Sequence, residues 1–200
     1  MKQAEDFLKE IGFSIPDELE NSPPLLQEGG GRKFELPQQD LHKQIESRAV
    51  YLLGIREHGA KELKSKLLSK FPETPELLAE YQAVPGVVAT VVDEVLLRCQ
   101  ANNWQSDERY IEQSVRNWAA KGCGPIKIRQ KLTMASDRSD LISAYLDRDD
   151  SEWLELALAA LLKKYGNIDL PSERKEQAKR MRFLQSRGFS SEIIWKAFRK

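Results

Sequence analysis

The sequence predicts an all-α protein whose nine principal helices fall into groups of three. Apolar residues recur at steps of three and four along most of the chain from residue 41 to residue 200. Short turns marked by glycine, proline or serine separate these periodic segments, and no segment pairs convincingly with a partner strand. With 200 residues and a hydrophobic content of 40%, the chain can bury a real core.

The central stretch, residues 107 to 132, reads DERYIEQSVRNWAAKGCGPIKIRQKL and predicts two helices joined by a short turn. Apolar residues of its first half share one helical face, at Tyr110, Ile111, Val115 and Trp118. Gly122 suits a helix end that needs positive φ, while Gly124 and Pro125 suit the N-cap and first turn of the next helix. Cations occupy the other sides of that second helix, at Lys127, Arg129 and Lys131.

Residues 1–40 are predicted to form a flexible acidic arm. They hold four Lys or Arg against nine Asp or Glu, and prolines and the Gly29 to Gly31 run break any helix beyond a short one around Phe7. Residues 41–200 accordingly carry a net charge of +5, and residues 174–200 alone a net charge of +7. One hypothesis is that the arm folds back on the basic faces and limits binding to DNA.

Residues 41–104 predict a helical group with a long second connection. A helix over 41–57 precedes a second one opened by Gly59, with Glu62 in a weak capping arrangement. A short helix over 77–83 and a long one over 87–102 follow. Residues 87–92 are rich in β-branched side chains, which also suits a strand, but the helical period continues to Cys99.

Two further groups, residues 105–148 and residues 149–200, complete the chain, the last with a basic C-terminus. The predicted helices after the central stretch span 140–147 and about 151–165, and two more form a hairpin around Ser190, the first of them basic. Counting from the turns at Gly59, Gly124 and Ser190 reveals a repeated spacing, with apolar residues nine and six positions before each turn and four and eight after it. This spacing indicates repeated hairpins, although any amphipathic hairpin gives a similar pattern, and an extra helix intervenes before the third.

The sequence gives little support to catalysis or to a cofactor or metal site. His42 and His58 have no nucleophile signature nearby and suit surface or helix-end roles. Cys99 and Cys123 lie outside any CxxC motif, so buried, inert thiols are expected. The aspartates at 147, 149 and 150 fall where helices end and begin, which favours capping over cation binding, and no phosphate loop is present.

Binding is better supported than catalysis. The candidate contact residues are the cations of the central turn and of the last basic helix: Lys121, Lys127, Arg129, Lys131, Arg180, Arg182 and Arg187. They can reach phosphates or carboxylates, although runs of cations are usually only the solvated faces of amphipathic helices. The four tryptophans are interpreted as core or interhelix anchors, Trp118 and Trp195 above all, because they lie beside apolar hairpin positions.

Residues 48–200 resemble the RecX family of regulatory proteins. RAVYLLGIREHGAKELKSKL is similar to the opening repeat of the family and KRMRFLQSRGFSSEIIWKAF to its close. The central block is the most specific, because Asp107, Arg109 and Tyr110 match a D-x-R-[YF] element. Further matches to a K-G-x-G-P-x-x-I-x element are Lys121, Gly122, Gly124, Pro125, Ile128 and Arg129. The resemblance implies three tandem three-helix repeats in an elongated, curved molecule.

The resemblance also implies a function. RecX proteins bind the filament of the RecA recombinase and restrain its ATPase, strand-exchange and coprotease activities, which implies a non-enzymatic modulator of recombination and the SOS response. The expected partners are the RecA filament and DNA, and the protein should bind DNA only weakly or through the filament. It is expected to be a monomer and not to bind a membrane. Arg109 is expected to be partly structural, pairing with a carboxylate.

Two alternatives remain open, a helical protein that binds DNA without RecA and a plain helical scaffold. No apolar run reaches the ~18 residues that span a bilayer, and the acidic start MKQAEDFLKEIG lacks the features of a signal peptide. A cytoplasmic location is therefore expected.

Overall fold

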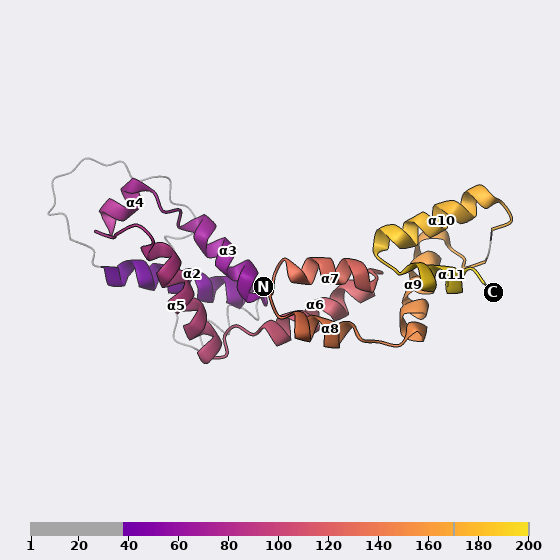
Figure 1. Ribbon diagram of the computed structural model, residues 1–200, viewed down its shortest axis with the longest axis horizontal. Helices are drawn as coiled ribbons and strands as arrows, with labels where there is room; N and C mark the ends of the chain where they lie inside the picture. The colour runs from indigo at the N-terminus through magenta and orange to yellow at the C-terminus, as the bar shows by residue number, and fades with distance from the viewer. Residues whose placement is uncertain (1–37, 170, 200) are drawn as a thin grey trace. The chain divides into compact units, whose positions relative to one another are not determined.

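The computed structural model describes residues 38–169 and 171–199, and all regular structure among them is helical (Figure 1). The helices are α2 (Gln38–Ile55), α3 (Ala60–Lys70), α4 (Pro75–Glu80), α5 (Val87–Ala101), α6 (Asp107–Ala120), α7 (Pro125–Thr133), α8 (Ser139–Leu146), α9 (Asp150–Tyr165), α10 (Arg174–Arg187) and α11 (Ser191–Ala197). These residues confirm the all-α class and the helical repeats. The predicted arm, including its helix around Phe7, lies almost wholly outside the described residues.

The contacts divide the chain into two compact units. Among described residues, the first unit holds 38–56 and 66–104, and the second holds 57–65 and 105–199. Helix α3 begins in the second unit and ends in the first. The boundaries predicted for the individual repeats, at 104/105 and 148/149, stay predictions.

The first unit is built on the packing of α2 against α5. The two helices bury apolar residues at helical spacing: Leu41, Ile45, Ala49 and Leu52 from α2, and Val88, Val91, Val92, Val95, Leu96 and Cys99 from α5. Residues 87–92 are therefore helical, and the strand alternative is wrong. In the connection between α3 and α5, Thr74 caps the short α4 by accepting a hydrogen bond from the Leu77 N–H at 3.3 Å.

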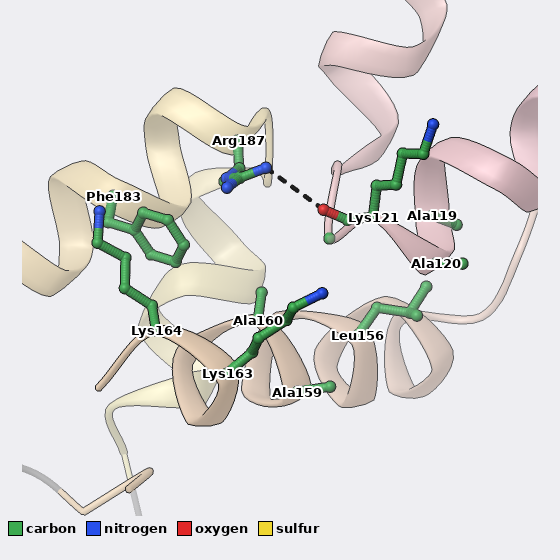
Figure 2. A pocket seen from close by; sticks show the side chains of 11 residues that line it. Ala119, Ala120, Lys121, Leu156, Ala159, Ala160, Lys163, Lys164, Phe183 and Arg187 are labelled. Carbon is green, nitrogen blue, oxygen red and sulfur yellow. Dashed lines mark hydrogen bonds between the residues drawn. The ribbon is translucent and has the colours of Figure 1, made fainter. Parts of the chain in front are cut away.

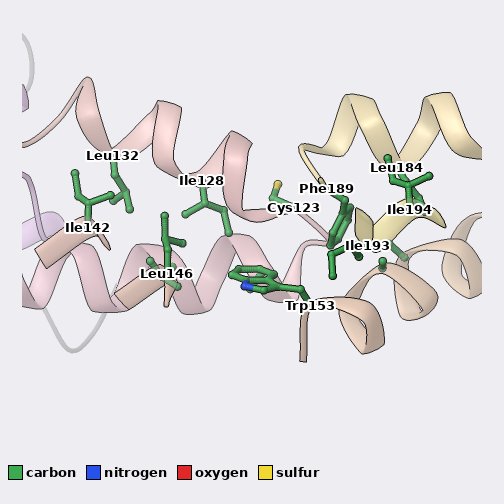
Figure 3. Close-up of a cluster of buried hydrophobic side chains, with 14 of the residues drawn as sticks. Cys123, Ile128, Leu132, Ile142, Leu146, Trp153, Leu184, Phe189, Ile193 and Ile194 are labelled. Carbon is green, nitrogen blue, oxygen red and sulfur yellow. The ribbon is translucent and has the colours of Figure 1, made fainter. Parts of the chain in front are cut away.

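The second unit has one continuous core, shared by α6, α7 and α8 and by α9, α10 and α11. Its buried side chains include Ile128, Leu132, Ile142, Leu146, Trp153, Leu184, Phe189, Ile193 and Ile194 (Figure 3). Trp153 and Phe189 are only 4% and 2% exposed, and large aromatic rings contribute much of the buried apolar area in such a core. The two helix triplets of this unit are thus bound together by the hydrophobic effect.

The repeated spacing corresponds to buried or half-buried positions. None of its twelve residues is exposed: Val50, Leu53, Leu63, Leu67, Val115, Trp118, Ile128, Leu132, Met181, Leu184, Ile194 and Phe198. The hairpins at Gly59 and Gly124 join the first and second helices of their groups. The hairpin at Ser190 joins α10 and α11, which follow α9, so it comes one helix later within its group.

Two expectations about single side chains are wrong. Trp195 was expected to be a core or interhelix anchor but is 58% exposed, because Ile193, Ile194 and Ala197 form the buried face of α11; Trp104, interpreted in the same way, is 45% exposed. His58 was expected at a surface or a helix end; it lies between the end of α2 and the start of α3 but is only 1% exposed, so the surface alternative is wrong. In both cases the neighbours that decide burial come from distant parts of the chain.

Candidate partner-binding surface

The turn between α6 and α7 has the predicted geometry. Gly122 adopts a φ of +74°, in the left-handed region that glycine enters without steric cost. Gly124 is the N-cap of α7 with φ −85° and ψ 170°, and Pro125 is its first residue. Lys121, the C-cap of α6, and the cations of α7 are thereby held on either side of a tight turn.

The start of α7 lies against the turn between α10 and α11. The N–H of Gly124 donates to the carbonyl of Arg187 at 2.8 Å, and the N–H of Ile126 donates to that of Gly188 at 3.0 Å. N–H groups in the first turn of a helix have no partner within the helix, so these carbonyls satisfy them. The second and third helix triplets are joined here by backbone hydrogen bonds, a contact that we call the α7–α10 seam.

Three of the predicted contact residues meet at the α7–α10 seam. Lys127 Nζ donates to the Ser186 carbonyl at 3.1 Å, and Arg187 Nη1 donates to the Lys121 carbonyl at 3.3 Å. Lys121 itself is exposed, while Lys127 and Arg187 are half-buried. Cations that lie far apart in the sequence therefore form one cluster at this seam.

The other predicted contact residues do not join that cluster through any contact we observe. Arg129 Nη1 donates to the Ser143 hydroxyl on α8 at 3.0 Å, and Lys131 lies over the ring of Trp118 at 4.8 Å. Arg182 is exposed on α10. Arg129, Lys131 and Arg182 remain accessible to a partner, since each is exposed.

Arg180 differs from the other predicted contact residues because it is only 8% exposed. Its Nη1 donates to Asn167 Oδ1 at 2.8 Å and to the Asp169 carbonyl at 3.1 Å, and its guanidinium lies 4.8 Å from the centre of the Tyr165 ring. The side chain ties α10 to the segment after α9. We therefore assign Arg180 to internal structure and leave it out of the candidate surface.

Asp107, at the start of α6, joins three segments of the second unit. Its Oδ1 accepts from the Ala60 N–H at 2.7 Å and from Gln105 Nε2 at 2.8 Å, and its Oδ2 accepts from the Ser136 hydroxyl at 2.5 Å. Gln105 also donates to the His58 carbonyl at 3.1 Å. Asp107, the first residue of the D-x-R-[YF] element, thus has a structural role, because it holds these segments together. Its partner Ser136 was missed in the sequence because nothing in its own neighbourhood marks it.

The other residues of that element are also structural. Arg109 Nε donates to Glu57 Oε1 at 2.8 Å, which confirms the expected pairing with a carboxylate. Tyr110 is buried, with 6% of its surface exposed. Gly59 packs against the chain after α7 so closely that a Cβ would lie 2.8 Å from the Ala135 carbonyl carbon.

A hollow of about 330 Å³ opens between α6, α9 and α10 (Figure 2). Its lining includes four cations, Lys121, Lys163, Lys164 and Arg187. Lys163 and Lys164 were missed in the sequence, because two cations in the last turn of a helix are ordinary complements to the helix dipole. Only the packing of α9 beneath α6 and α10 brings them beside the predicted cations. We call this feature the α6/α9/α10 hollow.

Among the described residues, no three or more His, Cys, Asp or Glu side chains lie together in a way that could hold a metal ion. Cys99 and Cys123 are buried free thiols, as predicted. Burial raises the pKa of the Cys99 thiol to about 11, and the charge of Glu46 acts in the same direction. Asp149 is the N-cap residue of α9, without a capping hydrogen bond from its side chain, and Asp147 is the C-cap residue of α8, while Asp150 pairs with Lys196 at 2.5 Å.

No helix in the described part of the chain is both long and apolar enough to cross a membrane.

Comparison with known proteins gives consistent relatives. Residues 150–198 match the model of the third three-helix domain of RecX. The regulatory protein RecX of Legionella pneumophila is 35% identical over 152 residues, which cover 76% of this chain and 91% of that one. The regulatory protein RecX of Serratia proteamaculans is 32% identical over 161 residues, covering 76% of this chain and 95% of that one.

Solved structures share the fold. The crystal structure of RecX from Lactobacillus salivarius superposes with a TM-score of 0.59 at 20% identity, over 80% of this chain and 95% of that one. A second crystal structure, of regulatory protein RecX, gives a TM-score of 0.60 at 22% identity, over 82% and 74% of the two chains. Because relatives above 30% identity align with most of both sequences, this chain belongs to the RecX family of regulatory proteins.

Proposed function

We propose that this protein is a negative modulator of the RecA recombinase. It binds the filament that RecA forms on DNA and restrains the ATPase, strand-exchange and coprotease activities of that filament in recombination and the SOS response. The observation that carries the proposal is the match to RecX regulatory proteins over about three quarters of this chain. We expect the protein to act in the cytoplasm and without chemistry of its own.

Cations of the second unit supply the proposed contacts. Lys121, Lys127 and Arg187 are clustered at the α7–α10 seam, where hydrogen bonds to backbone carbonyls orient Lys127 and Arg187. Side chains held in place before binding lose less conformational entropy when a partner arrives. Arg129, Lys131 and Arg182 are exposed and extend the basic surface on α7 and α10. Acidic surface of RecA, or phosphates of the DNA it holds, is the complementary partner.

The test is the RecA ATPase on single-stranded DNA, with this protein titrated well below one copy per RecA. Inhibition at such ratios supports a regulator that blocks filament growth, since simple competition for RecA would need comparable amounts of the two proteins. Binding of the protein to the same DNA is measured in parallel without RecA.

A DNA-binding protein that acts without RecA is the second candidate, and the net charge of +7 over residues 174–200 favours it. It predicts tight DNA binding that weakens steeply as salt rises, because each neutralised phosphate releases counterions. Strong, salt-sensitive DNA binding together with an unchanged RecA ATPase would reject the modulator and favour this candidate.

A further inference from the structure

The α6/α9/α10 hollow has the chemistry of a peptide-binding site. We propose that it receives an acidic segment of a partner protein, with carboxylates on its cations and one apolar side chain on its floor. The inference rests on the proposed function in one respect, that the partner recognised is a protein surface. It goes beyond that function because it adds a defined site with two residues, Lys163 and Lys164, that the sequence did not suggest.

The charge of the hollow is one-sided. Lys163 and Lys164 come from α9, Lys121 from the end of α6 and Arg187 from the end of α10. No carboxylate is among the residues that line it. Lining cations that come from three helices, with no anion among them, give the hollow a positive potential that attracts an anionic ligand. Carboxylates that neutralise them are therefore favoured ligands.

Two of these cations are held in place before any ligand binds. Arg187 donates to the Lys121 carbonyl at 3.3 Å, which is the dashed line in Figure 2. Its guanidinium also lies over the ring of Phe183, 5.2 Å from the ring centre. Lys164 lies over the same ring at 4.5 Å. The charged group of each side chain lies over the ring, which restricts its motion before binding and lowers the entropy lost when a ligand arrives.

The floor of the hollow is apolar and made of small side chains. It consists of Leu156 together with the methyl groups of Ala119, Ala120, Ala159 and Ala160. Small residues leave room where larger ones would fill the space, and a volume of about 330 Å³ is at the lower end of the range for ligand sites. Such a floor adds no favourable interaction with a phosphate, whereas burial of a leucine or phenylalanine side chain against it makes the binding free energy more favourable.

An acidic peptide suits this site better than a nucleic acid does. Proteins that hold single strands combine cations with exposed aromatic rings on which bases stack. The one ring in the hollow, Phe183, is half-buried and has both Lys164 and Arg187 over it. Bases would find no free platform here, whereas carboxylates and an aliphatic side chain find complementary groups.

The walls of the hollow are fixed by tight backbone contacts. Gly122 comes so close to α9 that an added Cβ would lie 3.2 Å from Ala160 Cβ. The α7–α10 seam holds the α10 wall against the start of α7. The hollow is consequently formed before binding, and it combines residues of the second and third helix triplets.

The experiment measures binding by fluorescence anisotropy with the full-length protein and three labelled probes. One is a short glutamate-rich peptide containing leucine, the second has serine in place of each leucine, and the third is an oligothymidylate of equal net charge. Lys163→Glu/Lys164→Glu reverses two cations of the hollow, and Ala159→Trp fills it without changing its charge. Lys175→Glu/Arg199→Glu is the control, since it makes the same charge change outside the lining.

We expect the leucine peptide to bind the unchanged protein more tightly than either other probe. The lysine double variant should weaken this binding by about 10-fold or more, because two attractions become repulsions. Ala159→Trp should weaken it as well, while the control keeps it, and circular dichroism should show the same helicity for all four proteins.

Other outcomes separate the hollow from the proposed function. Equal binding of the leucine and serine peptides would overturn the inference even if RecA is still inhibited. So would an oligothymidylate that binds more tightly than the leucine peptide and no longer binds the Lys163→Glu/Lys164→Glu variant. Loss of peptide binding in both hollow variants, together with loss of RecA inhibition, would support it. Peptide binding by a protein that does not inhibit RecA would support the hollow and reject RecA as the target.

Discussion

Gly124 lies so close to Gly188 that a Cβ at position 124 would stand 2.5 Å from the Gly188 carbonyl carbon. The backbone at Gly124 is extended, with φ −85°, so the conformation itself admits any residue. The requirement for glycine comes instead from the neighbouring helix triplet, whose chain leaves no room for a side chain.

Gly124→Ala should therefore lower the free energy of unfolding by about 1–3 kcal/mol, the usual cost of forcing extra atoms into packed structure. Urea unfolding followed by circular dichroism measures this change. Gly54→Ala is the matched control, because Gly54 lies within α2 and its Cβ would meet nothing within 4 Å. That control should raise stability by about 0.5–1 kcal/mol. Equal effects at the two positions would show that the α7–α10 seam tolerates a methyl group.

Asp107→Ala should destabilise the second unit by about 2–4 kcal/mol, because the carboxylate accepts three hydrogen bonds, two of them from residues far away in the sequence. Asp107→Asn keeps an acceptor for the Ala60 N–H and should cost less. Ser136→Ala removes only one of the three bonds. The free energies of unfolding should rank these variants in that order, and a smaller loss for Asp107→Ala than for Ser136→Ala would contradict the assigned network.

Arg129→Glu/Arg182→Glu should weaken inhibition of the RecA ATPase while leaving helicity intact. Both side chains are exposed, and reversal of their charge opposes an acidic partner. The titration curve of inhibition is compared with that of Lys175→Glu/Arg199→Glu, which changes the net charge equally. Inhibition as strong as that of the unchanged protein would refute the contribution of these two arginines.

Arg180→Gln should instead act on stability. The substitution removes a buried cation that donates to Asn167 Oδ1 and to the Asp169 carbonyl, at a cost of about 1–3 kcal/mol. Thermal unfolding measures the loss. At a temperature where the variant is fully folded, its inhibition of RecA per molecule should equal that of the unchanged protein, and a selective loss of inhibition would return Arg180 to the contact surface.

The Cys99 thiol should make stability depend on pH in the alkaline range. Its pKa is raised from 9.0 to about 11 by burial, so the folded state holds the proton more tightly than the unfolded state does. The resulting stabilisation is complete below pH 9.0 and is lost as the pH rises through about 11. Other groups titrate in the same range, so the quantity to measure is the difference in unfolding free energy between the unchanged protein and Cys99→Val.

This difference should be constant near neutral pH and shift against the unchanged protein between pH 9.0 and about 11. In the folded protein, Cys99 should also react slowly with iodoacetamide at pH 8, since little thiolate is present. Rapid alkylation without denaturant would contradict the buried, protonated thiol.

Local patterns in the sequence predict the helices and the turns of this protein well. The positive φ of Gly122, the N-cap at Gly124 and the first-turn position of Pro125 all follow from short-range steric rules. The partners of these residues could not be predicted in the same way. Gly188 reaches Gly124 only because the third triplet packs on the second.

The candidate surface likewise combines residues that the sequence predicts with contacts that it does not predict. The sequence identifies Lys121, Lys127 and Arg187 as cations, but their hydrogen bonds to carbonyls of other helices depend on tertiary packing. Arg180 resembles its neighbours in sequence and differs only in being covered. Likewise, Lys163 and Lys164 join the other cations of the α6/α9/α10 hollow only because α9 packs beneath α6 and α10.

The α7–α10 seam has a consequence for the order of events during synthesis. The ammonium group of Lys127 bonds to a carbonyl 59 residues further along the chain, and the N–H groups at the start of α7 also depend on that later region. At a translation rate of about 5–20 residues per second, the ribosome delivers those carbonyls several seconds after α7 has emerged. During this interval, the turn between α6 and α7 on the nascent chain is not yet covered by the third triplet.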